Sequence, residues 1–115
     1  MCTQAQLTQM LEQLAKQSRA VFGDKLKELI LFGSYARGDF DAESDVDVVL
    51  LMDVPHEDET AYHKQMVQLL GDLYEQFGYA TVVSPVIISA SFFEEWKNDL
   101  PFYKALMNEG VRIVA

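Results

Sequence analysis

LILFGSYARGDFDAESDVDVVLLM, residues Leu29–Met52, is the stretch that decides the fold of this chain. It predicts two short apolar strands joined by a Gly-Ser corner and a polar loop. Side chains alternate between the faces of a strand, so Asp45 and Asp47 project from one side. Upstream, Gly33 and Ser34 can open a helix whose unpaired backbone N–H groups favour an anion such as phosphate. Two carboxylates that can bind a metal ion, beside backbone groups that can bind phosphate, indicate nucleotide chemistry.

Length, composition and charge restrict the classes of function. With 115 residues, of which 50% are hydrophobic and 23% charged, the chain suits one globular domain over residues 1–115. Its formal net charge of −9 opposes binding to nucleic-acid backbones, which proteins achieve by neutralising phosphates with Lys and Arg. We therefore expect no long DNA or RNA as substrate, and no room for a second domain that binds an acceptor.

The sequence also argues against a membrane protein or a secreted protein. The longest apolar run, Val46–Met52, is interrupted by Asp47 and is far too short to span a bilayer. The single cysteine, Cys2, cannot form an internal disulfide, and the first residues lack the basic start and apolar centre of a signal peptide. We expect a cytoplasmic protein.

Hydrophobic periodicity predicts an α/β (α+β) fold, with a small mixed sheet of three to four strands and helices packed on it. The predicted helices span residues 3–22, 60–77, 92–97 and 101–108, and the predicted strands span residues 26–32, 45–53, 79–88 and 111–114. Thr3 with Gln6 suits a capping box, Ser91 an N-cap and Gly78 a helix stop. Pro85 cannot donate to a ladder, so its strand should be an edge strand or carry a bulge.

Asp45 and Asp47 are the candidate metal ligands. Two carboxylates on one strand face repel each other by about 4 kcal/mol at ~4 Å and an effective dielectric of 20. A divalent cation reverses that penalty, and ligands that are all oxygen favour Mg²⁺ or Mn²⁺ over zinc. In a site with two ions about 3.5 to 4 Å apart, both the attacking and the leaving oxygen of an in-line phosphoryl displacement are stabilised.

Ten residues separate Ser34 from Asp45, so the chain contains Gly-Ser, ten residues and then Asp-Val-Asp. In this GS-x10-DxD arrangement the chain resembles the minimal nucleotidyltransferases of the DNA polymerase beta superfamily. The resemblance covers nearly the whole chain in predicted element order and implies a palm-like nucleotidyltransferase fold. It also implies that Gly33 and Ser34 hold the terminal phosphates of a nucleotide, and that Asp45 and Asp47 are catalytic and bind Mg²⁺.

Arg37 and Ser44 lie inside the same motif and are further candidates for nucleotide binding. Arg37 could equally form an ion pair with Asp39 or Asp41. Ser34 could act as a helix cap, a role that is compatible with a phosphate contact.

The chain departs from the family pattern at one point. Active members that resemble it usually carry a third carboxylate on a later neighbouring strand, where it is expected to act as base or metal ligand for the acceptor hydroxyl. The corresponding run, Ala80–Ile88, contains no acid, and Glu94 and Glu95 lie beyond it on a predicted helix. General-base help contributes about 10²- to 10⁴-fold, so nucleotide binding should tolerate this loss better than transfer does.

Other patterns in the sequence have simpler interpretations. The acidic run Asp39–Asp47 lacks the glycine and glutamate of a calcium loop, because Ser44 and Leu50 stand at those positions. His56 and His63 have no neighbouring ligands at zinc spacing, which favours surface or partly buried roles. A group of aromatic residues is expected in the core or an interface, with base stacking as the alternative. These are Phe92, Phe93, Trp96, Phe102 and Tyr103.

The resemblance implies an enzyme that binds a nucleoside triphosphate, with ATP favoured, through Mg²⁺ or Mn²⁺. It would transfer a nucleoside monophosphate to a hydroxyl on a second polypeptide or on a second subunit of a homo-oligomer. Similar proteins are often paired with a small helical HEPN-domain protein, in some cases as antitoxin and toxin, and adenylylate a tyrosine of that partner. The alternative, favoured by the missing third acid, is a catalytically weak or inactive nucleotide-binding module that masks a partner surface.

Overall fold

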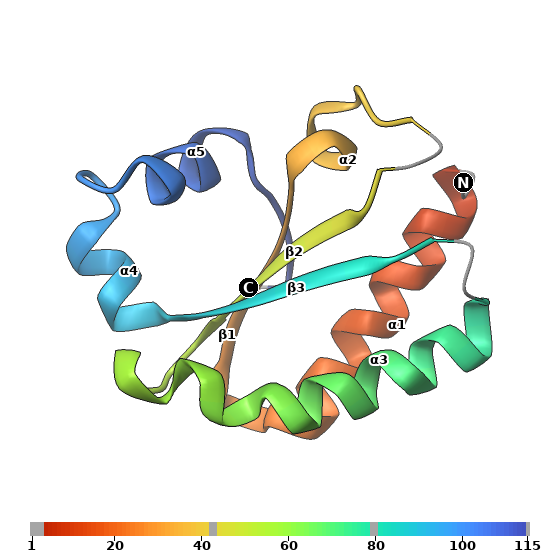
Figure 1. The fold of residues 1–115 in the computed structure, drawn as a ribbon, viewed down its shortest axis with the longest axis horizontal. Helices are drawn as coiled ribbons and strands as arrows, with labels where there is room; N and C mark the ends of the chain where they lie inside the picture. The colour runs from red at the N-terminus through yellow and green to blue at the C-terminus, as the bar shows by residue number, and fades with distance from the viewer. Residues whose placement is uncertain (1–3, 42–43, 79–80, 115) are drawn as a thin grey trace.

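A four-stranded sheet forms the centre of the structure, a computed structural model that describes residues 4–41, 44–78 and 81–114 (Figure 1). The strands are β1 (Leu26–Phe32), β2 (Val46–Met52), β3 (Val83–Ser89) and β4 (Val111–Val114), in the spatial order β3-β2-β1-β4. Strand β2 runs antiparallel to β1 and parallel to β3, and β4 runs antiparallel to β1. The sheet is therefore mixed, as the sequence predicts.

Helices cover both faces of this sheet. They are α1 (Gln4–Phe22), α2 (Gly33–Arg37), α3 (His63–Phe77), α4 (Ala90–Trp96) and α5 (Pro101–Glu109), with 3₁₀ helices η1 (Gly23–Lys25) and η2 (His56–Tyr62). The long helices α1 and α3 pack on one face, and α4 and α5 lie on the other (Figure 1). Among the described residues, the helices lack the combination of length and hydropathy that crossing a bilayer requires.

Alternation along β2 divides the core into two clusters. Val46, Val48, Leu50 and Met52 are buried in the cluster that includes α1 and α3. Val49 and Leu51 are buried in the cluster that includes Phe93 of α4 and Leu106 of α5. Since Asp47 stands between Val46 and Val48, its side chain faces the second cluster, on the side of α4 and α5.

Several local structural features predicted from the sequence are present in the structure, and one N-cap differs. Strand β1 has the predicted bounds, and α3 ends at Phe77 before Gly78, whose φ of +86° suits glycine. Pro85 lies in β3, an edge strand. The N-cap of α4 is Ser89 and not Ser91, because the Ser89 hydroxyl accepts the N–H of Phe92 at 3.3 Å. The capping box predicted at Thr3 lies outside the described residues.

Other element ends differ from the prediction for tertiary reasons. Strand β2 begins at Val46, one residue later than predicted, and α3 begins at His63 because residues 56–62 form η2. Strand β3 begins at Val83, where the Tyr74 hydroxyl accepts the backbone N–H at 2.8 Å and donates to the carbonyl at 3.3 Å. Residues 79 and 80 of the predicted strand lie outside the described residues.

Candidate active site

Asp47 lies near the start of the central strand β2, between two neighbouring strands. Its Cα partners are Phe32 at the end of β1 and Ser84 in β3. The Asp47 side chain is half-buried, and Asp45, immediately before the strand, is exposed. Burial raises the pKa of the Asp47 carboxyl above its ordinary value, the Asp45 charge raises it further, and the Arg37 charge lowers it. The two acids therefore interact as a like-charged pair.

The Gly-Ser corner packs directly against this pair. Gly33 begins α2 with a φ of +74°, and a Cβ atom there would lie 2.5 Å from Oδ2 of Asp47. Only glycine allows this close approach of the backbone to the carboxylate. Ser34 is half-buried, and its carbonyl accepts the N–H groups of Gly38 at 2.8 Å and Asp39 at 3.1 Å. The structure thus brings the predicted phosphate corner and the predicted metal strand together.

Arg37 ends α2 and is shared among acidic groups. Its Nε lies 3.2 Å from Oδ2 of Asp39, and its Nη1 lies 3.9 Å from Oε2 of Glu109 at the end of α5. The Asp39 pair is the alternative that the sequence left open. The guanidinium still acts on Asp47, since its charge lowers the pKa of that carboxyl. Arg37 therefore borders the site and links α2 to α5.

Ser44 is placed differently from the other candidates. Its hydroxyl accepts the N–H of Asp41 at 3.0 Å and lies 3.3 Å from Oδ1 of the same residue. The backbone N–H of Ser44 also donates to the Asp41 carbonyl at 3.2 Å. Within the described residues, Ser44 stabilises the turn that leads to Asp45, and its role toward a nucleotide stays a prediction.

Ser84 occupies the position beside Asp47 on the neighbouring parallel strand. It alternates with the buried Val83, so its side chain faces the same side of the sheet as Asp47. This is the strand on which the resemblance leads one to expect a third carboxylate. Residues 81–114, like the rest of the described chain, add no His, Cys, Asp or Glu that completes a group of three around a metal ion.

The donor set fits a magnesium-type ion that shares its coordination with a nucleotide. Mg²⁺ is usually held by one or two carboxylates together with substrate phosphates and water. Asp45 and Asp47 would supply the carboxylates, and their repulsion is the penalty that a cation would relieve. The absence of nitrogen and sulfur ligands from this pair does not suit zinc.

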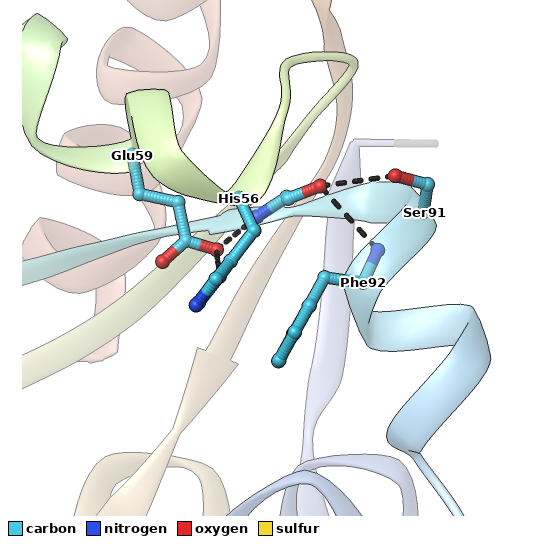
Figure 2. Close-up of polar contacts among 5 residues, drawn as sticks. His56, Glu59, Ser91 and Phe92 are labelled. Carbon is cyan, nitrogen blue, oxygen red and sulfur yellow. Dashed lines mark hydrogen bonds and ion pairs between the residues drawn. The ribbon is translucent and has the colours of Figure 1, made fainter.

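A second polar cluster lies at the other end of β3 (Figure 2). Oε2 of Glu59 accepts the N–H of Ser89 at 2.7 Å and lies 2.9 Å from Nδ1 of His56, whose ring stacks on Phe92. Ser89 is five residues beyond the partner of Asp47, roughly 17 Å away along the strand. The cluster joins η2 to β3 and α4. His56 is exposed, which agrees with the surface or partly buried role that the sequence favours.

Sequence reasoning missed two neighbours of the site, Glu109 and Ser84, and left the role of a third, Phe102, open. Glu109 reaches Arg37 from α5, and no pattern in the sequence links two charges so far apart. Ser84 carries no signal beyond its register with Asp47. Phe102 belongs to the aromatic group expected in the core or an interface, with base stacking as the alternative; Phe93 and Tyr103 of that group are buried, and Phe102 is exposed.

Comparisons with known proteins agree with this geometry. The family model described as a nucleotidyltransferase domain matches residues 9–110. A protein of Methanocaldococcus jannaschii, named "Putative protein adenylyltransferase MJ0141", is 37% identical over 97 residues, which are 81% of this chain and 94% of the relative. A second protein of that organism, named "Putative protein adenylyltransferase MJ0604", is 29% identical over 92 residues, or 80% of this chain and 82% of the relative.

A solved structure shows the same fold. It is a toxin-antitoxin crystallised with AMP-PNP, with a TM-score of 0.50 and 17% sequence identity over 89% of this chain and 70% of that one. At that identity the likeness concerns the fold alone. The match of the family model to most of the chain confirms the resemblance carried by the GS-x10-DxD motif. This chain belongs to the nucleotidyltransferase domain family.

Proposed function

We propose that this protein transfers AMP from ATP to a hydroxyl group of a partner protein and releases pyrophosphate. In this reaction the acceptor oxygen bonds to the α-phosphorus and its proton passes to solvent, while the bond from that phosphorus to the bridging oxygen of the β-phosphate breaks. Gly33 and Ser34 hold the terminal phosphates, and Asp45 and Asp47 hold Mg²⁺ or Mn²⁺. The observation that carries the proposal is the contact of the Gly33 backbone with the Asp47 carboxylate, in a chain that belongs to this family.

The metal supplies charge neutralisation between the carboxylates and the phosphates. The residues of the chain do the positioning. The backbone at Gly33 lets phosphate oxygens approach the carboxylates closely, and Arg37 lies near enough to exchange an acidic partner for a phosphate. Ser44 stabilises the turn before Asp45 and is proposed as a further nucleotide contact.

The acceptor is proposed to come from outside this chain. We propose that residues 1–115 form one domain and that its helices and strands serve to build that single fold. A small helical HEPN-type protein, related to this chain as toxin to antitoxin, is the proposed partner, and a second copy of this chain is the other source of a hydroxyl. A cytoplasmic location is part of this proposal, since ATP is available there.

A mass measurement tests this proposal. The protein is mixed with ATP, Mg²⁺ and the helical protein that co-purifies with it, and the partner is expected to gain the mass of AMP. The same mixture with Asp47→Asn should leave the partner unmodified. An unchanged partner mass at saturating ATP and Mg²⁺ with the wild-type protein would count against transfer.

Ser84 supports a second candidate function. Because a hydroxyl stands where a third carboxylate is expected, the chain could bind nucleotide and act by masking its partner with little or no transfer. Calorimetry with ATP, with and without Mg²⁺, separates the candidates when combined with the mass measurement. Binding of ATP without modification of the partner supports the masking module. If the double variant Asp45→Asn/Asp47→Asn still binds ATP in a metal-dependent way, both candidate functions lose their shared premise that these carboxylates hold the metal.

A further inference from the structure

One row of side chains crosses the sheet at the candidate site. Phe32 of β1, Asp47 of β2 and Ser84 of β3 are consecutive partners in the strand register. All three face the α4 and α5 side, because Phe32 packs on that core cluster and the other two alternate with buried valines. The metal-binding carboxylate proposed above therefore has an aromatic ring on one side and a hydroxyl on the other.

Phe102, in the first turn of α5, extends this aromatic side. Its ring lies 5.4 Å from the Phe32 ring, centroid to centroid, at 75° between the ring planes. The residue is 41% exposed, although aromatic rings in small domains usually gain stability from burial. Phe32 is itself only partly buried, so the two rings form a shelf beside the row, here called the Phe32/Phe102 shelf.

An ion pair at the other end of α5 also joins this helix to α2. The Arg37 guanidinium at the end of α2 lies 3.9 Å from Oε2 of Glu109 at the end of α5. Figure 1 shows α5 with α4 on the side of the sheet opposite α1 and α3, and α2 at the end of β1. Phe32 directly precedes Gly33 in the chain and is the partner of Asp47 in the register, so the shelf begins next to the Gly33 corner.

We propose that the Phe32/Phe102 shelf packs against the nucleobase of the bound nucleotide, and that Phe102 supplies the base-dependent part of its affinity. This inference rests on the proposed function, since it assumes that the phosphates lie at Gly33 and Ser34. In ATP the ribose joins the base to the α-phosphate, and the shelf lies beside the proposed metal site because Phe32 is the partner of Asp47 in the strand register. Aromatic rings stack on any base, and a purine offers the larger surface.

A nucleobase fits this shelf better than a protein segment does. The shelf consists of two rings, and the other exposed apolar side chains of α5 and β3, such as Met107 and Val86, do not belong to this aromatic pair. A protein interface needs a broad apolar centre with several buried anchors. Two partly exposed rings beside the proposed phosphate site offer a surface for one planar group.

Calorimetry with two probes tests the inference. The probes are ATP with Mg²⁺ and tripolyphosphate with Mg²⁺, which presents phosphates without a base. The variants are Phe102→Ala, Phe102→Tyr and the control Trp96→Ala, which removes an aromatic residue on α4 that is 39% exposed, close to the exposure of Phe102. Circular dichroism and thermal melting check that each variant folds, and replacement of an exposed ring should leave the fold intact.

The expected result is a loss that depends on the base. Phe102→Ala should bind ATP roughly 5- to 100-fold more weakly than wild type and bind tripolyphosphate unchanged. Phe102→Tyr and Trp96→Ala should bind both probes like wild type. ATP binding that survives Phe102→Ala would overturn the inference, and so would an equal loss of affinity for both probes. A loss of transfer without any loss of binding would also overturn it, because Phe102 would then act on the acceptor.

The failure of the inference can be told apart from the failure of the proposed function. If wild type binds ATP with Mg²⁺, Asp47→Asn does not and Phe102→Ala does, only the inference about the base is wrong. If wild type binds neither probe in the presence of Mg²⁺, the proposed function is wrong and the inference falls with it.

Discussion

Oδ2 of Asp47 lies 2.5 Å from the position that a Cβ atom would take on Gly33, so strand β2 and the start of α2 meet without room for a side chain. Real Cβ atoms do not approach an oxygen so closely. The φ of +74° at Gly33 adds a second reason for glycine, because side chains other than glycine disfavour that backbone conformation.

Gly33→Ala should therefore damage both the fold and the site. We expect a loss of about 1 to 2 kcal/mol in the free energy of unfolding from the backbone conformation alone, with a further loss from the displaced Asp47 carboxylate. Metal-dependent ATP binding should be lost in the protein that remains folded. Urea unfolding and calorimetry measure the two effects.

Gly71→Ala is the matched control for that substitution. Gly71 lies inside α3 on the surface, its φ is ordinary, and a Cβ atom there would meet nothing within 4 Å. Alanine is a better helix former than glycine by about 1 kcal/mol, so this variant should be more stable than wild type and bind ATP unchanged. Equal effects of the two alanines would contradict the role given to the Gly33 contact.

Asp47→Asn should change how stability depends on pH. Burial and the Asp45 charge raise the pKa of the Asp47 carboxyl against the lowering effect of Arg37, so the folded protein keeps this proton to higher pH than the unfolded chain does. Between those two pKa values the folded state binds more protons, and the free energy of unfolding falls as pH rises. Without metal, the free energy of unfolding of Asp47→Asn should not fall over this pH range. The variant should therefore melt at a higher temperature than wild type at neutral pH.

The response of the melting temperature to Mg²⁺ tests whether Asp45 and Asp47 bind the ion. Mg²⁺ should raise the melting temperature of wild type, because a ligand that binds the folded state stabilises it, and should leave Asp47→Asn and Asp45→Asn unchanged. Asp72→Asn removes an exposed carboxylate from α3 and should respond to Mg²⁺ as wild type does. A Mg²⁺ response that persists in both site variants would place the ion elsewhere.

Glu59→Ala should destabilise the protein without affecting the site. It removes the acceptor of the Ser89 N–H, and an unpaired buried donor costs about 1 to 3 kcal/mol. Glu59→Gln keeps an acceptor oxygen and should cost less. Urea unfolding measures both, and ATP binding should persist because the cluster lies at the far end of β3 from Asp47. A loss of ATP binding in folded Glu59→Ala would contradict this separation.

The sequence predicts much of the local structure and only part of the site. Alternation and the spacing between Ser34 and Asp45 predict β1, most of β2 and the meeting of the Gly-Ser corner with the carboxylates, because these features depend on neighbours in the chain. The start of β3 depends on the Tyr74 hydroxyl, and the Arg37 contact with Glu109 depends on how α5 packs. Such contacts between distant residues leave no periodic signal.

Ser84→Asp tests whether the missing third carboxylate limits transfer by this protein. The register places residue 84 beside Asp47 on the same sheet face, where a third carboxylate could accept the proton of the acceptor hydroxyl. Without metal, the added like charge should lower the melting temperature. With Mg²⁺, transfer to the partner should rise about 10²-fold, the lower end of general-base help. Ser84→Asn matches the shape without the charge and should give no gain. If Ser84→Asp binds Mg²⁺ and ATP but transfers no faster than wild type, the missing acid is not what limits this protein.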